Sequence, residues 1–427
     1  MKETYARSVL TNGLRVVSEY MPAVRSVALG VWVETGSRDE TPALKGVSHF
    51  LEHMLFKGTT RRTARQIAEA LEDVGGSLNA YTSKEFCCYT AHVLDEHLPL
   101  AVDVLADILQ NSLLAESDIE KEKEVILREM DHSRETPEDV IFDYLYEDVF
   151  PGHPLGHPVY GEEATVKGFT RAELADYLRS HYTKGRMVVA AAGSISHELL
   201  VGLVERGFSD LPENNRPLRQ PPVQPPCGHA RHQQCAQAHV CIGGRAYPYA
   251  DPRKFALLVL DTILGAGMSS RLFQRVREEH GAAYAVYSFV DFFSDTGLLG
   301  VYFATEPNRL ALCTDLVLAE LKALCQNGIP GEELLRAKSQ LKGNLVLALE
   351  NTSSRMSRLA KLEIYLQSFC SLEETIAQIE AVTLRDVQQV AAELLAEDRL
   401  IVTRLEPKRR TRGPSRIRPQ LPAQPAE

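Results

Sequence analysis

A proline-rich stretch, Leu211–Gln234, divides this chain of 427 residues almost in half. It contains the run PPVQPP, and proline at this density favours an exposed linker over a helix or a strand. The halves on either side echo each other in the order of their predicted strands, helices and glycine turns. Each half is long enough to enclose a hydrophobic core of its own. The chain is therefore expected to fold as two similar domains, related by an internal duplication.

Hydrophobic periodicity predicts strands that interleave with helices and form hairpins in both halves. This pattern favours an α+β fold, in which each domain is an antiparallel-rich sheet with helices packed on one face. The strands are expected at 14–19, 26–34, 238–245, 283–290 and 296–304, and helices of the second half at 253–264 and 270–279. The predicted divisions are a domain at 1–212, a linker at 213–234, a second domain at 235–406 and a basic, disordered tail at 407–427.

The sequence His49-Phe50-Leu51-Glu52-His53 carries the strongest chemical signal. On a helix, positions four apart lie on the same face, so His49 and His53 can bind one ion together. Glu52 then lies beside that ion, where a carboxylate can take a proton from a metal-bound water. The pattern H-x-x-E-H is the inverted form of a zinc peptidase motif. The alternative is an ordinary helix that holds two histidines.

A catalytic zinc site needs a third protein ligand and one open position for water. The segment Ser117–Arg134 is predicted to form a long helix of mixed charge. Within it, Glu122 and Glu129 are seven residues apart, so the two carboxylates point the same way. The pattern alone also fits a solvated helix face of Glu/Lys pairs, and it does not decide between the two interpretations.

The segment Gly46–Thr59, GVSHFLEHMLFKGT, resembles the active-site segment of the pitrilysin-type (inverted zincin, M16) metallopeptidases. The likeness is closest to the beta subunit of mitochondrial processing peptidase and its single-chain bacterial relatives. It covers nearly the whole chain and implies two homologous domains that enclose a cavity. It also implies that Glu129, in the segment ILREM, completes the zinc site. Glu122 then corresponds to the family glutamate that orients the site without binding the metal.

The same resemblance assigns further residues to the substrate. Asn79 and Ala80 match an edge strand to which an extended peptide can add, and Phe86 is expected beside that strand. Arg277 and Tyr284 match a family pair that holds the substrate and stabilises the oxyanion formed in the reaction. Each also has a structural interpretation: a hairpin strand, a helix-end arginine and a core tyrosine.

Asp139 and Asp143 lie four residues apart on a predicted helix that starts near Pro137. In the processing-peptidase beta subunit, acids at these positions recognise an arginine near the cut, and two carboxylates on one face can hold a guanidinium. Surface acids on a solvated helix are the alternative.

Net charge supports a peptide substrate. The chain carries −10, while six basic residues and one acid after Glu406 contribute +5, so the body is close to −15. A negative body suits cationic peptides and argues against nucleic acid as the main partner. No apolar run approaches the length of a membrane span, and no export signal is apparent at the N-terminus.

The eight cysteines show no disulfide framework and are expected to be reduced thiols of a cytoplasmic protein. Cys227, His229, His232 and Cys235 could hold a second, structural zinc, although their spacing is too tight for an ordinary zinc finger. His153 and His157 are also four apart, but Pro154 and Gly156 favour a loop, so no metal is assigned to them.

The sequence thus predicts a zinc-dependent endopeptidase that hydrolyses unfolded peptides or presequences, with Zn²⁺ as its cofactor and a homodimer as its assembly. His49, His53 and Glu129 are the expected metal ligands, and Glu52 is the expected general base. The alternative is a non-catalytic assembly subunit of a peptidase-like complex. Such relatives typically lose a motif residue, and this chain keeps all of them.

Overall fold

The computed structural model describes residues 4–213 and 218–408, and the expectation of a disordered tail falls largely outside these ranges. The first half of the chain forms a mixed sheet with the strand order β1-β2-β6-β3-β5-β4. All neighbouring strands in it are antiparallel except β2 and β6. Its strands are β1 (Thr4–Val9), β2 (Arg15–Tyr20), β3 (Ser26–Val33), β4 (Ser77–Thr82), β5 (Cys87–Leu94) and β6 (Met187–Gly193).

The second half forms a sheet with the order β7-β11-β8-β10-β9, in which only β7 and β11 are parallel. Without β1, the first sheet has the same order and the same directions, strand for strand. The predicted α+β fold with two homologous, antiparallel-rich domains is therefore confirmed. The strands of the second sheet are β7 (Ala230–Gln233), β8 (Ala238–Ala246), β9 (Ala285–Phe292), β10 (Gly297–Thr305) and β11 (Ile401–Pro407).

The helices follow the same duplication. In the first half they are α1 (Val47–Leu55), α2 (Ala64–Glu72), α3 (Leu98–Asn111), α4 (Glu116–Glu135), α5 (Pro137–Val149), α6 (Glu163–Gly168), α7 (Arg171–His181) and α8 (His197–Gly207). In the second half they are α9 (Lys254–Leu264), a π-helix at Phe273–Glu279, α10 (Leu310–Asn327), α11 (Gly331–Ala348), α12 (Thr352–Leu366), α13 (Leu372–Ala381) and α14 (Leu384–Leu394). By chain order, α9 is the counterpart of α1, and α12 is the counterpart of α5.

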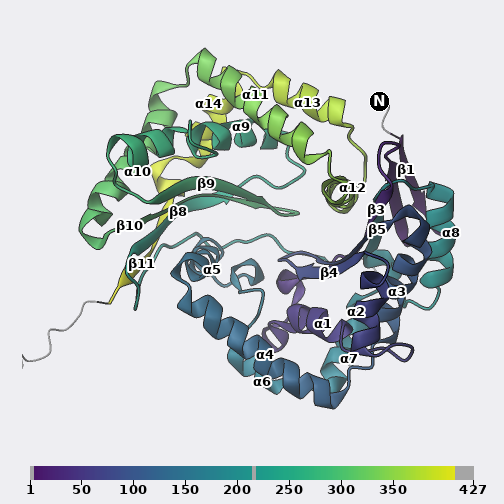
Figure 1. Ribbon diagram of the computed structural model, residues 1–427. Helices are drawn as coiled ribbons and strands as arrows, with labels where there is room; N and C mark the ends of the chain where they lie inside the picture. Colours follow the sequence, from purple (N-terminus) through teal and green to yellow (C-terminus); the bar gives the residue numbers. More distant parts are fainter. Residues whose placement is uncertain (1–3, 214–217, 409–427) are drawn as a thin grey trace, which may run out of the picture.

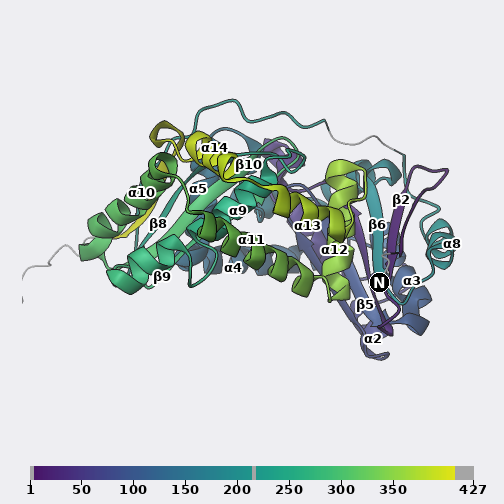
Figure 2. The same ribbon diagram turned by 90° about the horizontal axis from the view of Figure 1, so that it is seen from above.

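Each half sends one helix to the other half. Helix α12 packs on β2, β3 and β6 of the first sheet, and α5 packs on β8 and β11 of the second (Figures 1 and 2). The remaining helices of each half cover the opposite face of its own sheet, as expected. Because α12 and α5 close the second faces, helices lie on both faces of each sheet, not on one alone.

A buried ion network joins the two halves and the linker. Arg38 lies 2.6 Å from Glu85 and 2.5 Å from Asp295, which belongs to the turn between β9 and β10. Arg219, from the linker, binds Asp39 at 2.8 Å, and its side chain is only 10% exposed. The predicted linker is therefore partly tied down. It also ends earlier than expected, because Ala230–Gln233 forms β7 at the edge of the second sheet.

Candidate functional site

Helix α1 carries the H-x-x-E-H motif and begins after Gly46, which has a φ of 90°. The N-terminus of the helix is capped by a carboxylate six residues before Gly46. The two oxygens of Glu40 accept the backbone N–H groups of Gly46 at 2.7 Å and Ser48 at 2.8 Å. Glu40 is 4% exposed, and burial raises its pKa to about 7. This carboxylate fixes the position of the site helix.

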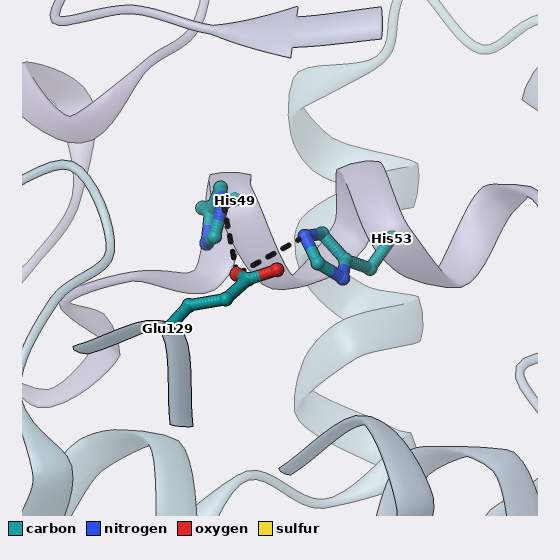
Figure 3. Close-up of side chains that lie close together, drawn as sticks. All are labelled: His49, His53 and Glu129. Atoms are coloured by element: carbon teal, nitrogen blue, oxygen red, sulfur yellow. Dashed lines mark ion pairs between the residues drawn. The ribbon is translucent and has the colours of Figure 1, made fainter. Parts of the chain in front are cut away.

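His49 and His53 lie on one face of α1 and point toward Glu129 of α4 (Figure 3). The Glu129 Oε2 atom lies 3.9 Å from His49 Nε2 and 3.6 Å from His53 Nε2. One ligand atom from each side chain lies within 4.8 Å of the others. The structure therefore brings the three predicted ligands together, from two helices that are separate in sequence. We call these residues the His49–His53–Glu129 cluster.

The spacing and the environment of the cluster fit a divalent cation. Ligands of a tetrahedral zinc ion lie about 3.3 Å apart. The two distances from the Glu129 carboxylate to the imidazoles, 3.6 and 3.9 Å, are somewhat longer, and all three ligand atoms lie within 4.8 Å of one another. Burial, and secondarily His53, lower the pKa of His49 to about 4, so this imidazole is neutral at pH 7, as a ligand must be. The His49 Nδ1 atom is buried and has no hydrogen-bond partner among the described residues.

Glu122 lies where a residue that orients a ligand would be expected. Its Oε2 atom accepts a hydrogen bond from His53 Nδ1 at 3.0 Å, which leaves the lone pair of Nε2 directed at Glu129. Its other oxygen lies 2.6 Å from the ammonium of Lys57, which follows α1. Glu122 is 5% exposed, and its carboxylate is stabilised by the charge of Lys57 and by the hydrogen bond from the His53 ring.

Glu52 is also on α1, and the Thr82 hydroxyl donates a hydrogen bond to its Oε2 atom at 2.5 Å. Burial is the main cause that raises the pKa of Glu52, and the negative charge of Glu129 adds to it. A carboxyl with a raised pKa is a stronger base once ionised. Sequence reasoning found Glu52 but missed Thr82, which lies 30 residues away in the chain.

The predicted substrate strand is β4, and it is the outer strand of the first sheet because it pairs with β5 alone. Asn79 is exposed, and its side-chain oxygen accepts the N–H of Ala80 at 2.8 Å. Phe86 follows β4 but is only 6% exposed and packs in the cluster between the first sheet and α12. Part of its surface lines a pocket of about 350 Å³ together with Lys84 and Tyr365.

Asp139 and Asp143 lie on α5, as predicted, but their surroundings differ. Asp139 is exposed, whereas Asp143 is half-buried and accepts a hydrogen bond from Tyr160. Burial raises the pKa of Asp143, while the buried ammonium of Lys84 acts in the opposite direction. Asp143 therefore already has partners within the chain, and Asp139 is the more available of the two carboxylates.

Arg277 and Tyr284 lie together in the second half, where the guanidinium is 5.9 Å from the centre of the Tyr284 ring. Arg277 belongs to the π-helix, and Tyr284 is 77% exposed. Among the described residues, no hydrogen bond or ion pair joins either of them to the His49–His53–Glu129 cluster. The structure thus brings the predicted pair together but does not join it to the other site residues.

The second candidate metal site is not assembled. His229 Nδ1 instead binds the buried carboxylate of Asp148 at 2.7 Å, and Cys227 Sγ is 4.0 Å from His229 Nε2. Across residues 4–213 and 218–408, the His49–His53–Glu129 cluster is the only group of three or more His, Cys, Asp or Glu side chains close enough to share an ion. His153 and His157 flank a 3₁₀ turn at Pro154–Gly156, in agreement with the predicted loop. All eight cysteines are free thiols.

Comparison with known proteins gives the family. Residues 15–163 match the family model described as insulinase, peptidase family M16, and residues 168–341 match the M16 inactive domain. The chain is 41% identical to the uncharacterized zinc protease YmxG of Bacillus subtilis over 92% of this chain and 96% of that protein. It is 45% identical to the uncharacterized zinc protease Rv2782c of Mycobacterium tuberculosis over 91% of this chain and 90% of that protein.

Solved structures show the same fold. A protease from Helicobacter pylori aligns with a TM-score of 0.88 at 21% identity and covers 95% of this chain and 100% of its own. An M16 inactive domain from Pseudomonas fluorescens aligns with a TM-score of 0.89 at 20% identity, over 95% and 98% of the two chains. With α9 lacking histidine, the second half fits the description of an inactive domain. This chain belongs to the M16 family of peptidases.

Proposed function

We propose that this protein is a zinc-dependent endopeptidase that cuts unfolded peptides or presequences. The observation that carries the proposal is the convergence of two imidazole nitrogens and one carboxylate oxygen within 4.8 Å of one another. His49, His53 and Glu129 would hold Zn²⁺ and leave a fourth position open for water. Membership of the M16 family and relatives named as zinc proteases support this choice of metal.

When bound, zinc would act as a Lewis acid and bring the pKa of water close to 7. Glu52 would take a proton from the water that attacks the peptide carbonyl and would later pass it to the leaving amine. Glu122 keeps the His53 ring in one orientation and one tautomer through the hydrogen bond to Nδ1. Arg277 and Tyr284 would stabilise the negative charge that develops on the carbonyl oxygen.

The substrate would add to β4 as an extra strand, with its backbone paired along Asn79 and Ala80. An edge strand is suited to this because one row of its N–H and C=O groups has no neighbouring strand. Asp139 and Asp143 would favour an arginine near the cut, with Asp139 as the more accessible carboxylate. Phe86 would contribute only the small part of its surface that lines the pocket.

We further propose that the enzyme acts as a homodimer in the cytoplasm. The exposed pair Arg277 and Tyr284 makes no hydrogen bond or ion pair to the cluster of its own chain within the described residues, which supports a role across an interface between subunits. Free cysteines throughout the chain support a reducing compartment. No helix in the described ranges is long and apolar enough to cross a membrane.

Zinc analysis combined with a peptide-cleavage assay on the wild type and Glu52→Gln tests the proposal. The expected result is one zinc ion in both proteins and cleavage by the wild type alone. His53→Ala is expected to lose the metal and the cleavage together. The alternative, a non-catalytic assembly subunit, predicts that the wild type cuts no peptide even when fully loaded with zinc. Equal cleavage by the wild type and Glu52→Gln would remove Glu52 as the base.

A further inference from the structure

We propose that Thr82 is a positioning residue that fixes the carboxylate of Glu52, and this inference rests on the proposed role of Glu52 as general base. The Thr82 hydroxyl donates to Glu52 Oε2 over 2.5 Å. The two residues belong to β4 and α1, which pack against each other (Figure 1). Thr82 thus links the strand proposed to receive the substrate with the residue proposed to move the proton.

Glu52 depends on this contact for its orientation. The hydrogen bond from Thr82 is the only one that the Glu52 carboxylate makes within the residues that the structure describes. A glutamate side chain has several rotatable bonds, and a base must be held within about 3 Å of the proton that it takes. With Oε2 bound to Thr82, the other oxygen has no fixed partner and is available to a water molecule.

The Thr82 hydroxyl is itself held in place. Along β4 the side chains alternate, and Leu78, Ala80 and Thr82 are less exposed than the residues between them. Thr82 ends the strand, and the turn after it is anchored to a neighbouring loop, because Ser37 N–H donates to Ser83 O at 3.2 Å and Arg38 N–H donates to Lys84 O at 2.8 Å.

The Thr82 hydroxyl has a single hydrogen and two neighbouring acceptors. Cys87 Sγ lies 3.6 Å away, so the much closer carboxylate is the preferred acceptor. The donor is therefore preorganised, as a group that supports a reacting side chain should be. The Thr82 side chain faces α1 and not the edge of β4 to which a peptide would add. Loss of its hydroxyl should therefore lower kcat more than it changes KM.

Thr82→Val tests this role, because it keeps the shape of the side chain and removes only the hydroxyl. We expect kcat for a fluorogenic peptide to fall about tenfold, with KM within about twofold of wild type and the zinc content unchanged. Thr82→Ser retains the donor and should recover most of the lost rate. Thr90→Val is the matched control, because Thr90 lies on the adjacent strand β5 and contacts Asn79 O, not Glu52.

A double-mutant cycle on the metal-free protein gives a readout that does not depend on activity. If Thr82 acts on Glu52, the lowering of the melting temperature in Thr82→Val/Glu52→Leu should be smaller than the sum of the two single effects, because leucine, unlike glutamine, has no oxygen to accept the Thr82 hydrogen. Additive effects, or a rate loss as large in Thr82→Ser as in Thr82→Val, would overturn the proposal. If the two substitutions are not additive but the wild type cuts no peptide, the contact between Thr82 and Glu52 exists and the proposed function fails.

Discussion

At the scale of single residues, Glu40 links the acid–base chemistry of the core to the position of the site helix. Its carboxylate binds the first N–H groups of α1, and burial raises its pKa from 4.5 to about 7. The folded state therefore binds this proton more tightly than the unfolded state does. The stabilisation is complete below pH 4.5 and is lost as the pH rises through 7.

Glu40→Gln is expected to remove this pH dependence. Between pH 4.5 and pH 8, the free energy of unfolding of the wild type should fall by about 3 kcal/mol more than that of the variant. Urea unfolding at several pH values measures both curves, and their difference cancels the titration of all other groups. A difference between the two proteins that stays constant with pH would show that Glu40 is not buried with a raised pKa.

Lys57 acts on the metal site through Glu122. Its ammonium lies 2.6 Å from Glu122 Oε1, while Oε2 holds His53. Lys57→Met leaves that buried carboxylate without its cation, so we expect zinc affinity to fall about tenfold, as measured by competition with a chelator. Lys121→Met is the matched control, because Lys121 lies 3.1 Å from Asp118 on the surface of α4 and is 72% exposed. Equal affinities in the two variants would contradict the role of Lys57.

The spacing of Glu122 and Glu129 places their carboxylates on one side of α4, but the sequence pattern alone does not single them out from the other acids of that helix. Each follows a buried isoleucine, Ile119 or Ile126, by three residues, yet Glu122 is buried whereas the side chain of Glu129 is 47% exposed. Their roles still needed the family resemblance, because charge pattern alone also fits a solvated face. Glu40, Lys57 and Thr82 could not be found in this way. Glu40 and Thr82 lie outside the quoted motifs, and Lys57 lies within Gly46–Thr59 without any sign of its partner. Each contact forms at a spacing that is not a helical or strand period, so no periodicity indicates it.

At the scale of elements, the crossing of α5 and α12 is the feature that sequence reasoning missed. A signal was present in β3 and β6, whose residues are apolar on both faces and nearly all buried. Such continuous apolar strands indicate that both faces of a sheet are covered. The sequence does not say which helix supplies the second cover. In each domain the covering helix comes from the other half of the chain. An ion pair adds to the packing of α12 on the first sheet, because Glu363 of α12 lies 2.8 Å from Arg7 of β1.

Leu359 tests how much the crossing of α12 contributes to stability. It is 1% exposed and packs with residues of the first sheet. Leu359→Ala should lower the free energy of unfolding by about 3 kcal/mol, because it removes buried methyl groups and leaves a cavity. Leu335→Ala, on α11, changes a side chain that is 64% exposed and should cost less than about 0.5 kcal/mol. Chemical denaturation compares the two, and similar losses would mean that α12 is not an integral part of the first domain's core.

At the scale of the whole molecule, the two halves are joined by packing and by charge. The crossing helices cover each other's sheets, and Arg38, Glu85 and Asp295 form ion pairs where the halves meet. Buried pairs of this kind are costly to separate, because each charge would lose its partner. The two halves are therefore expected to keep a fixed position relative to each other. The metal cluster belongs to the first half of the chain, and Arg277 and Tyr284 belong to the second.

The separation of Arg277 and Tyr284 from the cluster leads to a prediction about the assembly. If these side chains serve the site of a second copy, Arg277→Ala and Glu52→Gln each inactivate a different part of one shared centre. We expect both variants to be nearly inactive alone and to regain activity when they are unfolded, mixed and refolded together. In the mixed dimer, the Glu52→Gln subunit supplies Arg277 and Tyr284 to the intact cluster of the other. A mixture of Glu52→Gln and His53→Ala is the control, because both changes fall in the same half and no site is restored. Absence of recovery in the first mixture, with mixed dimers demonstrated by mass spectrometry, would place Arg277 at the site of its own chain.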